Sequence, residues 1–142
     1  MNDIDFFSYG LRLLGRREYS VLKLRNKLLK RFPENVEEVE AALVLLKEKQ
    51  FLSNDRFCRA YIQDQILKKN GPQKILMKLR IEGIEDVMSL KYIDEGYPLD
   101  LQQEIKEYLW ERKECELRRK TLSEAEKNYK IRQYLYQKGF YL

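Results

Sequence analysis

The sequence predicts an all-α fold made of tandem three-helix repeats, arranged as an elongated, curved helical array. Glycine and proline are scarce in the 142 residues, at 6 and 3, and residues that favour helices dominate. Apolar residues recur at the three- and four-residue spacing of amphipathic helices. One basic helical pattern also occurs three times, at a period of about 50 residues, which lies within the range of repeat proteins.

The basic pattern is clearest in residues 20–32, SVLKLRNKLLKRF. Its apolar positions are Val21, Leu24 and Leu28, and its cationic positions on the other side are Lys23, Lys27 and Lys30. In residues 71–83 the corresponding positions are Lys74, Ile75, Lys78 and Leu79, and in residues 127–140 they are Lys130, Ile131, Tyr134 and Leu135. Each copy therefore predicts one buried face and one positive face.

The first repeat is expected to cover residues 1–52. Its helices are predicted over residues 4–16, 20–32 and 35–49. Ser20 suits the N-cap of the second helix, and Pro33 stops that helix. Asn35 and Glu38 have the spacing of a capping box at the start of the third helix.

The second repeat is expected to cover residues 53–96. Its helices are predicted over residues 54–69, 72–82 and 84–94. Ser53 or Asn54 caps the first of them, and Pro72 suits the first position of the second. Gly83 is placed to end that second helix.

The third repeat is expected to cover residues 97–142 and to be incomplete, with two helices and no third. The segment Asp94–Asp100, DEGYPLD, is predicted to be the clearest linker in the chain. A charged helix over residues 101–120 should follow, and Ser123 with Glu126 suggests a capping box for the last helix. Without a third helix, the apolar residues near residue 140 would need another partner.

Composition limits the possible chemistry. The chain has no histidine, which removes the commonest general base and transition-metal ligand. Cys58 and Cys115 are expected to be free, buried or half-buried thiols. No phosphate loop, zinc-ligand pattern or nucleophile elbow is present, so we expect no enzymatic activity, metal or cofactor. With no long apolar run and an acidic start to the chain, a cytoplasmic protein is expected.

The net charge of +5 is modest, so the distribution of charge matters more than its sum. The candidate binding residues are Arg16, Arg17, Lys23, Lys27, Lys30, Arg31, Lys68, Lys69, Lys74, Lys78, Arg80 and Lys130. Such a set could neutralise phosphates or meet an acidic protein surface, while the plainer interpretation is a solvated helix face. Acidic segments at residues 34–40 and 82–95 could contact a partner or simply complement helix N-termini. The aromatic residues Tyr129, Tyr134, Tyr136, Phe140 and Tyr141 could stack on unpaired bases or pack between helices.

Four segments together resemble the RecX family of bacterial regulators. They are YGLRLLGRREYSVLKLRNKL, VEAALVLLKEKQFLSNDRFCRAYI, KNGPQKILMKLRIEGI and RQYLYQKGF. The matching positions are Arg17, Ser20, Leu24, Leu28, Leu52, Asp55, Arg56, Phe57, Gly71, Leu79, Gly83, Leu135, Gly139 and Phe140. Most of these positions have a scaffold character, and the missing last helix departs from the family pattern.

The resemblance implies tandem three-helix repeats and a non-enzymatic regulator that binds the RecA recombinase filament, mostly inhibiting strand exchange and ATP hydrolysis. It places the protein in homologous recombination, DNA repair and the SOS response. Contact with single-stranded DNA is expected to be weak or indirect. No membrane or small-molecule substrate is expected, and the protein is expected to be a monomer. The alternatives are a sequence-nonspecific nucleic-acid-binding helical module without a recombinase partner, and a helical adaptor for another protein.

Overall fold

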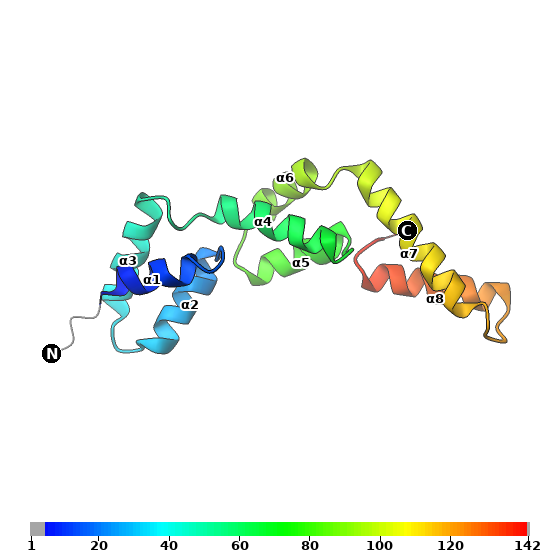
Figure 1. The fold of residues 1–142 in the computed structure, drawn as a ribbon, viewed down its shortest axis with the longest axis horizontal. Helices are drawn as coiled ribbons and strands as arrows, with labels where there is room; N and C mark the ends of the chain where they lie inside the picture. The colour runs from blue at the N-terminus through cyan, green and yellow to red at the C-terminus, as the bar shows by residue number, and fades with distance from the viewer. Residues whose placement is uncertain (1–4, 142) are drawn as a thin grey trace. The chain divides into compact units, whose positions relative to one another are not determined.

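The computed structural model describes residues 5–141, and within that range it is entirely helical (Figure 1). The helices are α1 (Phe6–Leu14), α2 (Val21–Arg31), α3 (Val36–Glu48), α4 (Asn54–Leu67), α5 (Pro72–Ile81), α6 (Asp86–Gly96), α7 (Leu99–Leu117) and α8 (Glu124–Gln137). No strand is present between residues 5 and 141. The predicted all-α class is therefore confirmed. Ile4 and Leu142, the expected first residue of the first helix and last residue of the third repeat, lie outside the described residues.

The chain forms two compact units, and two of the boundaries between them fall within helices. One unit comprises residues up to Ala60 together with Leu79–Glu85, and the other comprises Tyr61–Lys78 and Asp86–Leu142. Helices α4 and α5 thus contribute residues to both units. The division into repeats at residues 1–52, 53–96 and 97–142 stays a prediction.

The first unit is built on the packing of α1 and α2 against α3 (Figure 1). Leu24 and Leu28 of α2 are fully buried in a core with Leu43 and Leu46 of α3. Gly10 lets α1 lie close to α3, because a Cβ atom at this position would be 2.7 Å from a methyl carbon of Leu46. The apolar positions of the basic pattern therefore hold α2 in place, as its periodicity predicts.

In the second unit, α7 and α8 pack side by side (Figure 1). Ile105 and Leu109 of α7 and Ile131 and Leu135 of α8 are buried. Phe140, just after α8, is also buried, with 3% of its surface exposed. The apolar positions expected for the third copy of the pattern are thus confirmed as core positions.

Local capping explains where several helices begin and end. The hydroxyl of Ser20 accepts a hydrogen bond from the Lys23 amide at 3.1 Å, so Ser20 is the N-cap of α2, as predicted. Ser123 and Glu126 form the predicted capping box of α8. Asn35 occupies the N-cap position of α3, but its side chain makes no capping hydrogen bond, so the capping box expected there is wrong.

The second basic helix also begins and ends as predicted. Pro72 is the first residue of α5, where its missing N–H leaves no helix bond unmade. Gly83 follows the end of α5 with φ of +79°, and a Cβ atom there would lie 2.9 Å from Leu22. Glycine is needed for the backbone conformation and for the close approach of α2.

The predicted linker at Asp94–Asp100 is mostly helical. Helix α6 extends to Gly96 and α7 begins at Leu99, so only Tyr97 and Pro98 connect them. Tyr97 is 1% exposed, and its hydroxyl donates a hydrogen bond to the carbonyl oxygen of Asn70 at 2.9 Å. Burial raises the pKa of Tyr97 to about 12. The residues that look like a flexible turn in sequence therefore anchor the second unit.

The cysteines differ in environment. Both are free thiols, and neither forms a disulfide. Cys58 is fully buried. Its pKa is raised to about 11, mainly by this burial and to a smaller extent by the nearby negative charge of Asp55. Cys115 is exposed, so the expectation of a buried or half-buried thiol is wrong there. Within the described part of the chain, no helix combines the length and apolar character needed to cross a membrane.

Candidate functional site

The candidate cations of the first unit that precede or lie on α2 are exposed. They are Arg16, Arg17, Lys23, Lys27, Lys30 and Arg31. Their exposure follows from the helix itself, because Leu24 and Leu28 turn the opposite face of α2 into the core. The positive face predicted for this helix therefore exists in the first unit.

Lys23 is committed to an ion pair inside that unit. Its Nζ lies 3.4 Å from a carboxylate oxygen of Glu82, whose side chain is 12% exposed. The other carboxylate oxygen of Glu82 accepts a hydrogen bond from the Ser20 hydroxyl at 2.8 Å. Lys23 thus helps to join the start of α2 to the segment after α5 while its side chain stays 47% exposed on the positive face, and its part in binding stays a prediction.

Two other cations of this unit are held against one aromatic ring. The guanidinium carbon of Arg17 lies 4.6 Å from the ring centre of Tyr19, and Nζ of Lys27 lies 5.8 Å from it. Tyr19 itself is buried, with 4% of its surface exposed. Cation–π attraction therefore orients both charges while their polar heads remain at the surface.

The other half of the candidate set is less uniformly exposed. Lys68 is exposed and pairs with Asp64 at 3.3 Å, one turn earlier on α4. Lys69, Lys74 and Lys78 are half-buried, which corrects the expectation that Lys74 faces solvent freely. Arg80 on α5 and Lys130 on α8 are exposed.

Three lysines of the second unit come together from distant parts of the sequence. Lys69 follows α4, Lys74 lies in the first turn of α5, and Lys138 follows α8. Partial burial, and then the charges of Lys74 and Lys69, lower the pKa of Lys138. Lys69, Lys74 and Lys138 are called the lysine cluster below.

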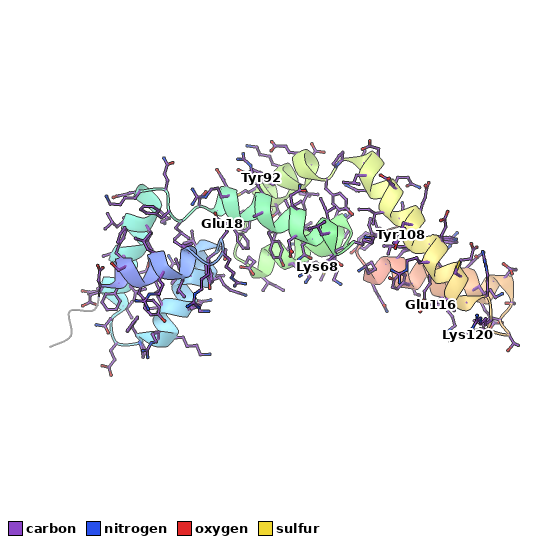
Figure 2. All side chains as sticks on the ribbon, in the orientation of Figure 1. Glu18, Lys68, Tyr92, Tyr108, Glu116 and Lys120 are labelled. Carbon is purple, nitrogen blue, oxygen red and sulfur yellow. The ribbon has the colours of Figure 1, made fainter. Side chains whose placement is uncertain are left out.

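Two residues of the lysine cluster have fixed positions. Nζ of Lys138 donates a hydrogen bond to the backbone carbonyl oxygen of Lys68 at 3.1 Å. Nζ of Lys69 lies 5.1 Å from the ring centre of Tyr108 on α7. The guanidinium carbon of Arg112 lies 5.8 Å from the same ring centre, so α7 adds a second cation to this ring. Figure 2 labels Lys68 after α4 and Tyr108 on α7.

A backbone contact brings the lysine cluster together. The Gly71 amide donates to the carbonyl oxygen of Lys138 at 2.6 Å, and the Gln73 amide donates to the carbonyl oxygen of Gly139 at 3.1 Å. These two hydrogen bonds are called the backbone clasp below. A Cβ atom on Gly71 would lie 2.4 Å from the carbonyl carbon and oxygen of Gly139, so a side chain there is excluded.

Sequence reasoning identified Lys69 and Lys74 but missed Lys138 and Arg112. Lys138 lies near the end of the predicted last helix, and nothing in its local sequence pattern relates it to Lys74. Gly71 and Gly139 were interpreted only as local features, a helix break and a helix end, although both matched the family pattern. The structure adds a reason that both share, the close approach of two backbones, beside the positive φ of +98° at Gly139.

One residue from each acidic segment, Glu40 and Glu82, contacts a cation within the first unit. Glu40 accepts hydrogen bonds from the guanidinium of Arg25 at 2.8 and 3.2 Å, and Glu82 pairs with Lys23. These contacts give both carboxylates a structural role. Among residues 5–141, no group of histidine, cysteine or acidic side chains is arranged to hold a metal ion.

The aromatic group near the end of the chain divides into two kinds of residue. Tyr134 is half-buried, and Nζ of Lys113 lies 5.0 Å from its ring centre, whereas Phe140 is a core residue. Tyr136 and Tyr141 stack on each other with ring centres 4.8 Å apart, and both are exposed, as is Tyr129. Packing therefore accounts for Tyr134 and Phe140, while the other three rings are accessible.

The fold and the site define an all-helical protein that gathers cations at its surface, in part from segments far apart in sequence. No protein-family model matches the chain. Relatives named regulatory protein RecX do match it. The relative from Actinobacillus pleuropneumoniae serotype 5b (strain L20) is 24% identical over 141 residues, covering 99% of this chain and 88% of that protein. The relative from Haemophilus influenzae (strain PittEE) is 39% identical over 80 residues, covering 55% of this chain and 51% of that protein.

Solved structures of similar fold carry the same name. A crystal structure of regulatory protein RecX superposes with a TM-score of 0.83 at 24% identity, covering 95% of this chain and 65% of that one. The crystal structure of RecX from Lactobacillus salivarius gives a TM-score of 0.82 at 20% identity, covering 95% of this chain and 86% of that one. The chain is thus similar in sequence to proteins named regulatory protein RecX, and it shares the fold of the RecX crystal structures.

Proposed function

We propose that the protein binds filaments of the RecA recombinase and mostly inhibits their strand exchange and ATP hydrolysis in recombination and repair. It acts by binding, without a catalytic step of its own, as a cytoplasmic monomer. The similarity to RecX proteins supports the regulatory role, since those relatives are named regulatory proteins. The observation that carries the binding role is the presence of accessible cations on both units, from Arg16 to Lys138.

The proposed mechanism depends on several contacts made at once. A filament presents the same protomer repeatedly and carries DNA phosphates, so a chain with several small helical repeats engages more than one protomer. Linked contacts of this kind bind far more tightly than any single contact. A protein bridging protomers hinders entry of a second DNA strand and the subunit changes that accompany ATP turnover.

The decisive experiment measures ATP hydrolysis and strand exchange by RecA on single-stranded DNA, with and without the protein. We expect both rates to fall as the protein is added and to recover as salt is raised, because salt screens contacts with phosphates. No effect with excess protein at low salt would overturn the proposal.

A variant pair places the test on the first unit. Lys27→Glu with Lys30→Glu reverses two exposed charges of α2 that have no carboxylate partner among residues 5–141. This pair should weaken the inhibition. Lys47→Glu with Lys49→Glu, at the end of α3, makes the same charge change elsewhere and should leave the inhibition unchanged. Lys23→Glu is unsuitable because it would break the Glu82 ion pair.

The second candidate function is direct nucleic-acid binding without a recombinase partner. The lysine cluster favours direct nucleic-acid binding, because clustered lysines attract backbone phosphates whatever the base sequence. Filter binding to DNA separates the two. Tight binding to bare DNA that RecA leaves unchanged favours this second function.

A further inference from the structure

The lysine cluster assembles across the backbone clasp. Lys138 supplies a carbonyl oxygen to the clasp, and its ammonium is bonded to the turn after α4. Lys74 lies directly beside the clasp, since its Cβ is 2.5 Å from the position that a Cβ atom on Gly139 would occupy. Closing the clasp therefore brings three positive charges together, and their mutual repulsion opposes the closure.

These charges are not neutralised within the unit. Among residues 5–141, none of the three lysines forms an ion pair with a carboxylate. The surroundings instead add positive charge, because Arg112 shares the Tyr108 ring with Lys69. A half-buried group of like charges held in this way is suited to an anion supplied from outside.

We propose that the lysine cluster binds the phosphates of a single nucleic-acid strand, and that this binding strengthens the backbone clasp between α5 and α8. The lysine cluster belongs to the accessible cations that carry the proposed binding role, so naming its ligand rests on the proposed function. Phosphate oxygens neutralise the repulsion that opposes closure. Binding and closure are therefore thermodynamically linked, each favouring the other.

The contacts of the individual lysines fit this role. The hydrogen bond from Lys138 and the ring contact of Lys69 hold their ammonium groups in place before a ligand arrives, which reduces the ordering cost of binding. Lysine ammonium groups are compact charges that bind phosphate oxygens from many directions. The amides of Gly71 and Gln73 are already bonded within the clasp, so the cations provide the site and the helix terminus does not.

Tyr108 favours a nucleic-acid strand over an acidic protein segment. Tyr108 is 45% exposed, and its ring centre lies 5.1 Å from Nζ of Lys69 and 5.8 Å from the guanidinium carbon of Arg112. An aromatic surface flanked by cations accommodates a base and its neighbouring phosphates together. An acidic peptide would use the cations and has no comparable use for the ring.

The test measures binding of the full chain to an oligothymidine of about 15 nucleotides, a length comparable to single-strand sites in other proteins. The variant Lys69→Gln/Lys74→Gln/Lys138→Gln should bind about 30-fold more weakly at low salt, and its salt dependence should be shallower by about two powers of salt concentration. The matched control, Lys47→Gln/Lys49→Gln/Lys120→Gln, removes three exposed charges outside the cluster and should bind like the natural sequence. Equal binding by the cluster variant and the control overturns the site.

The coupling has its own measurement. Hydrogen exchange at the amides of Gly71 and Gln73 should slow by about tenfold when the oligonucleotide saturates the natural sequence. In the cluster variant, the oligonucleotide should leave this exchange unchanged. Binding with no change in the natural sequence overturns the coupling. If the triple variant does not fold, Lys69→Gln/Lys74→Gln is used, which keeps the bond from Lys138 to the carbonyl of Lys68.

Two further probes identify the ligand. Tripolyphosphate at equal phosphate concentration should protect the clasp less than the oligonucleotide, and equal protection would mean that free oligophosphate is the ligand. Polyglutamate should compete weakly, and competition equal to that of oligothymidine overturns the assignment to nucleic acid. None of these measurements includes RecA. Failure of the proposed function in the RecA assay therefore leaves their result intact, and the reverse also holds.

Discussion

The amide of Gly71 donates a hydrogen bond of 2.6 Å to the carbonyl oxygen of Lys138, across 67 positions of sequence. Helix α5 has amides at its N-terminus without partners inside the helix, and the end of α8 has carbonyls in the same condition. The contact between Gly71 and Lys138, repeated between Gln73 and Gly139, lets each helix end satisfy the other. This arrangement leaves room for no atom beyond the backbone, and it gathers the lysine cluster around itself.

The first prediction concerns the space at Gly71. Gly71→Ala places a methyl group 2.4 Å from backbone atoms of Gly139, and backbone cannot swing aside as a side chain does. We expect a loss of about 2–3 kcal/mol in the free energy of unfolding, measured by urea denaturation.

Gly15→Ala is the matched control for this change. Gly15 is the C-cap of α1 with φ of −67°, and its nearest neighbours to an added Cβ are 3.4 Å away. Its unfolding free energy should change by less than about 1 kcal/mol. If the Gly71→Ala protein is as stable as the Gly15→Ala protein, the backbone clasp can open without lowering the free energy of unfolding.

The second prediction separates the two partners of Glu82. Ser20→Ala removes the N-cap of α2 and the hydroxyl that donates to the mostly buried Glu82 carboxylate. The expected cost is about 1–2 kcal/mol. Lys23→Gln removes an ion pair whose lysine is 47% exposed, so its cost should stay below about 1 kcal/mol.

Thermal or urea unfolding of both variants and of the double variant gives the coupling between them. A larger loss from Lys23→Gln than from Ser20→Ala would contradict this assignment. In that case the ion pair, rather than the hydroxyl, would be the main link between α2 and the segment after α5.

The third prediction is a pH dependence that belongs to Lys138. Partial burial, Lys74 and Lys69 lower its pKa in the folded protein below the ordinary 10.5. Between the folded value and 10.5, the unfolded chain binds more protons at this group, so its contribution to stability rises as pH increases. At pH values below the pKa in the folded protein, Lys138 is charged in both states and the destabilisation of the folded state is complete.

Comparison of the natural sequence with Lys138→Gln isolates the effect of this charge, including its repulsion with Lys74 and Lys69, because groups outside the lysine cluster are the same in both. The stability difference should favour Lys138→Gln near neutral pH and shrink as pH rises toward 10.5. A difference that is flat over this range, measured by urea unfolding at each pH, would show that Lys138 is not perturbed.

The fourth prediction concerns thiol reactivity. The Cys58 thiol is fully buried and its pKa is raised to about 11, so near neutral pH it has little thiolate and no access to reagent. Cys115 is exposed and should be alkylated by iodoacetamide first. Mass spectrometry should therefore find one modified cysteine in the folded protein and two in urea. With Cys115→Ser, the folded protein should stay unmodified, and rapid modification of Cys58 would mean that the N-terminal half of α4 opens readily.

Much of the local structure was predictable because the contacts that decide it span only a few residues. Ser20 bonds to an amide three residues away, and Ser123 and Glu126 bond to each other's backbone. Pro72 and Gly83 act through their own backbone angles. Asn35 shows the limit, since a suitable residue at the N-cap did not form the expected hydrogen bond.

The candidate site was only partly predictable. Exposure of Lys27 and Lys30 follows from the helical period of α2, because the opposite face is apolar. The ion pair of Lys23 could not be foreseen, since Glu82 lies in another segment and reads as an ordinary acidic residue near a helix start. Tyr97 resembled a linker residue for a similar reason, as its anchor, the carbonyl of Asn70, has no side-chain signature.

The sequence by itself determined that the chain is helical, where most of its helices begin and end, and which face of each basic helix is apolar. These properties depend on backbone preferences and on side chains within one or two turns. Tertiary structure decided which charges are paired, which are free and which are gathered. Lys138 joins Lys69 and Lys74 only because two glycines allow the backbones of α5 and α8 to meet. The energy of a charge depends on neighbours in space, and only the folded chain sets those neighbours.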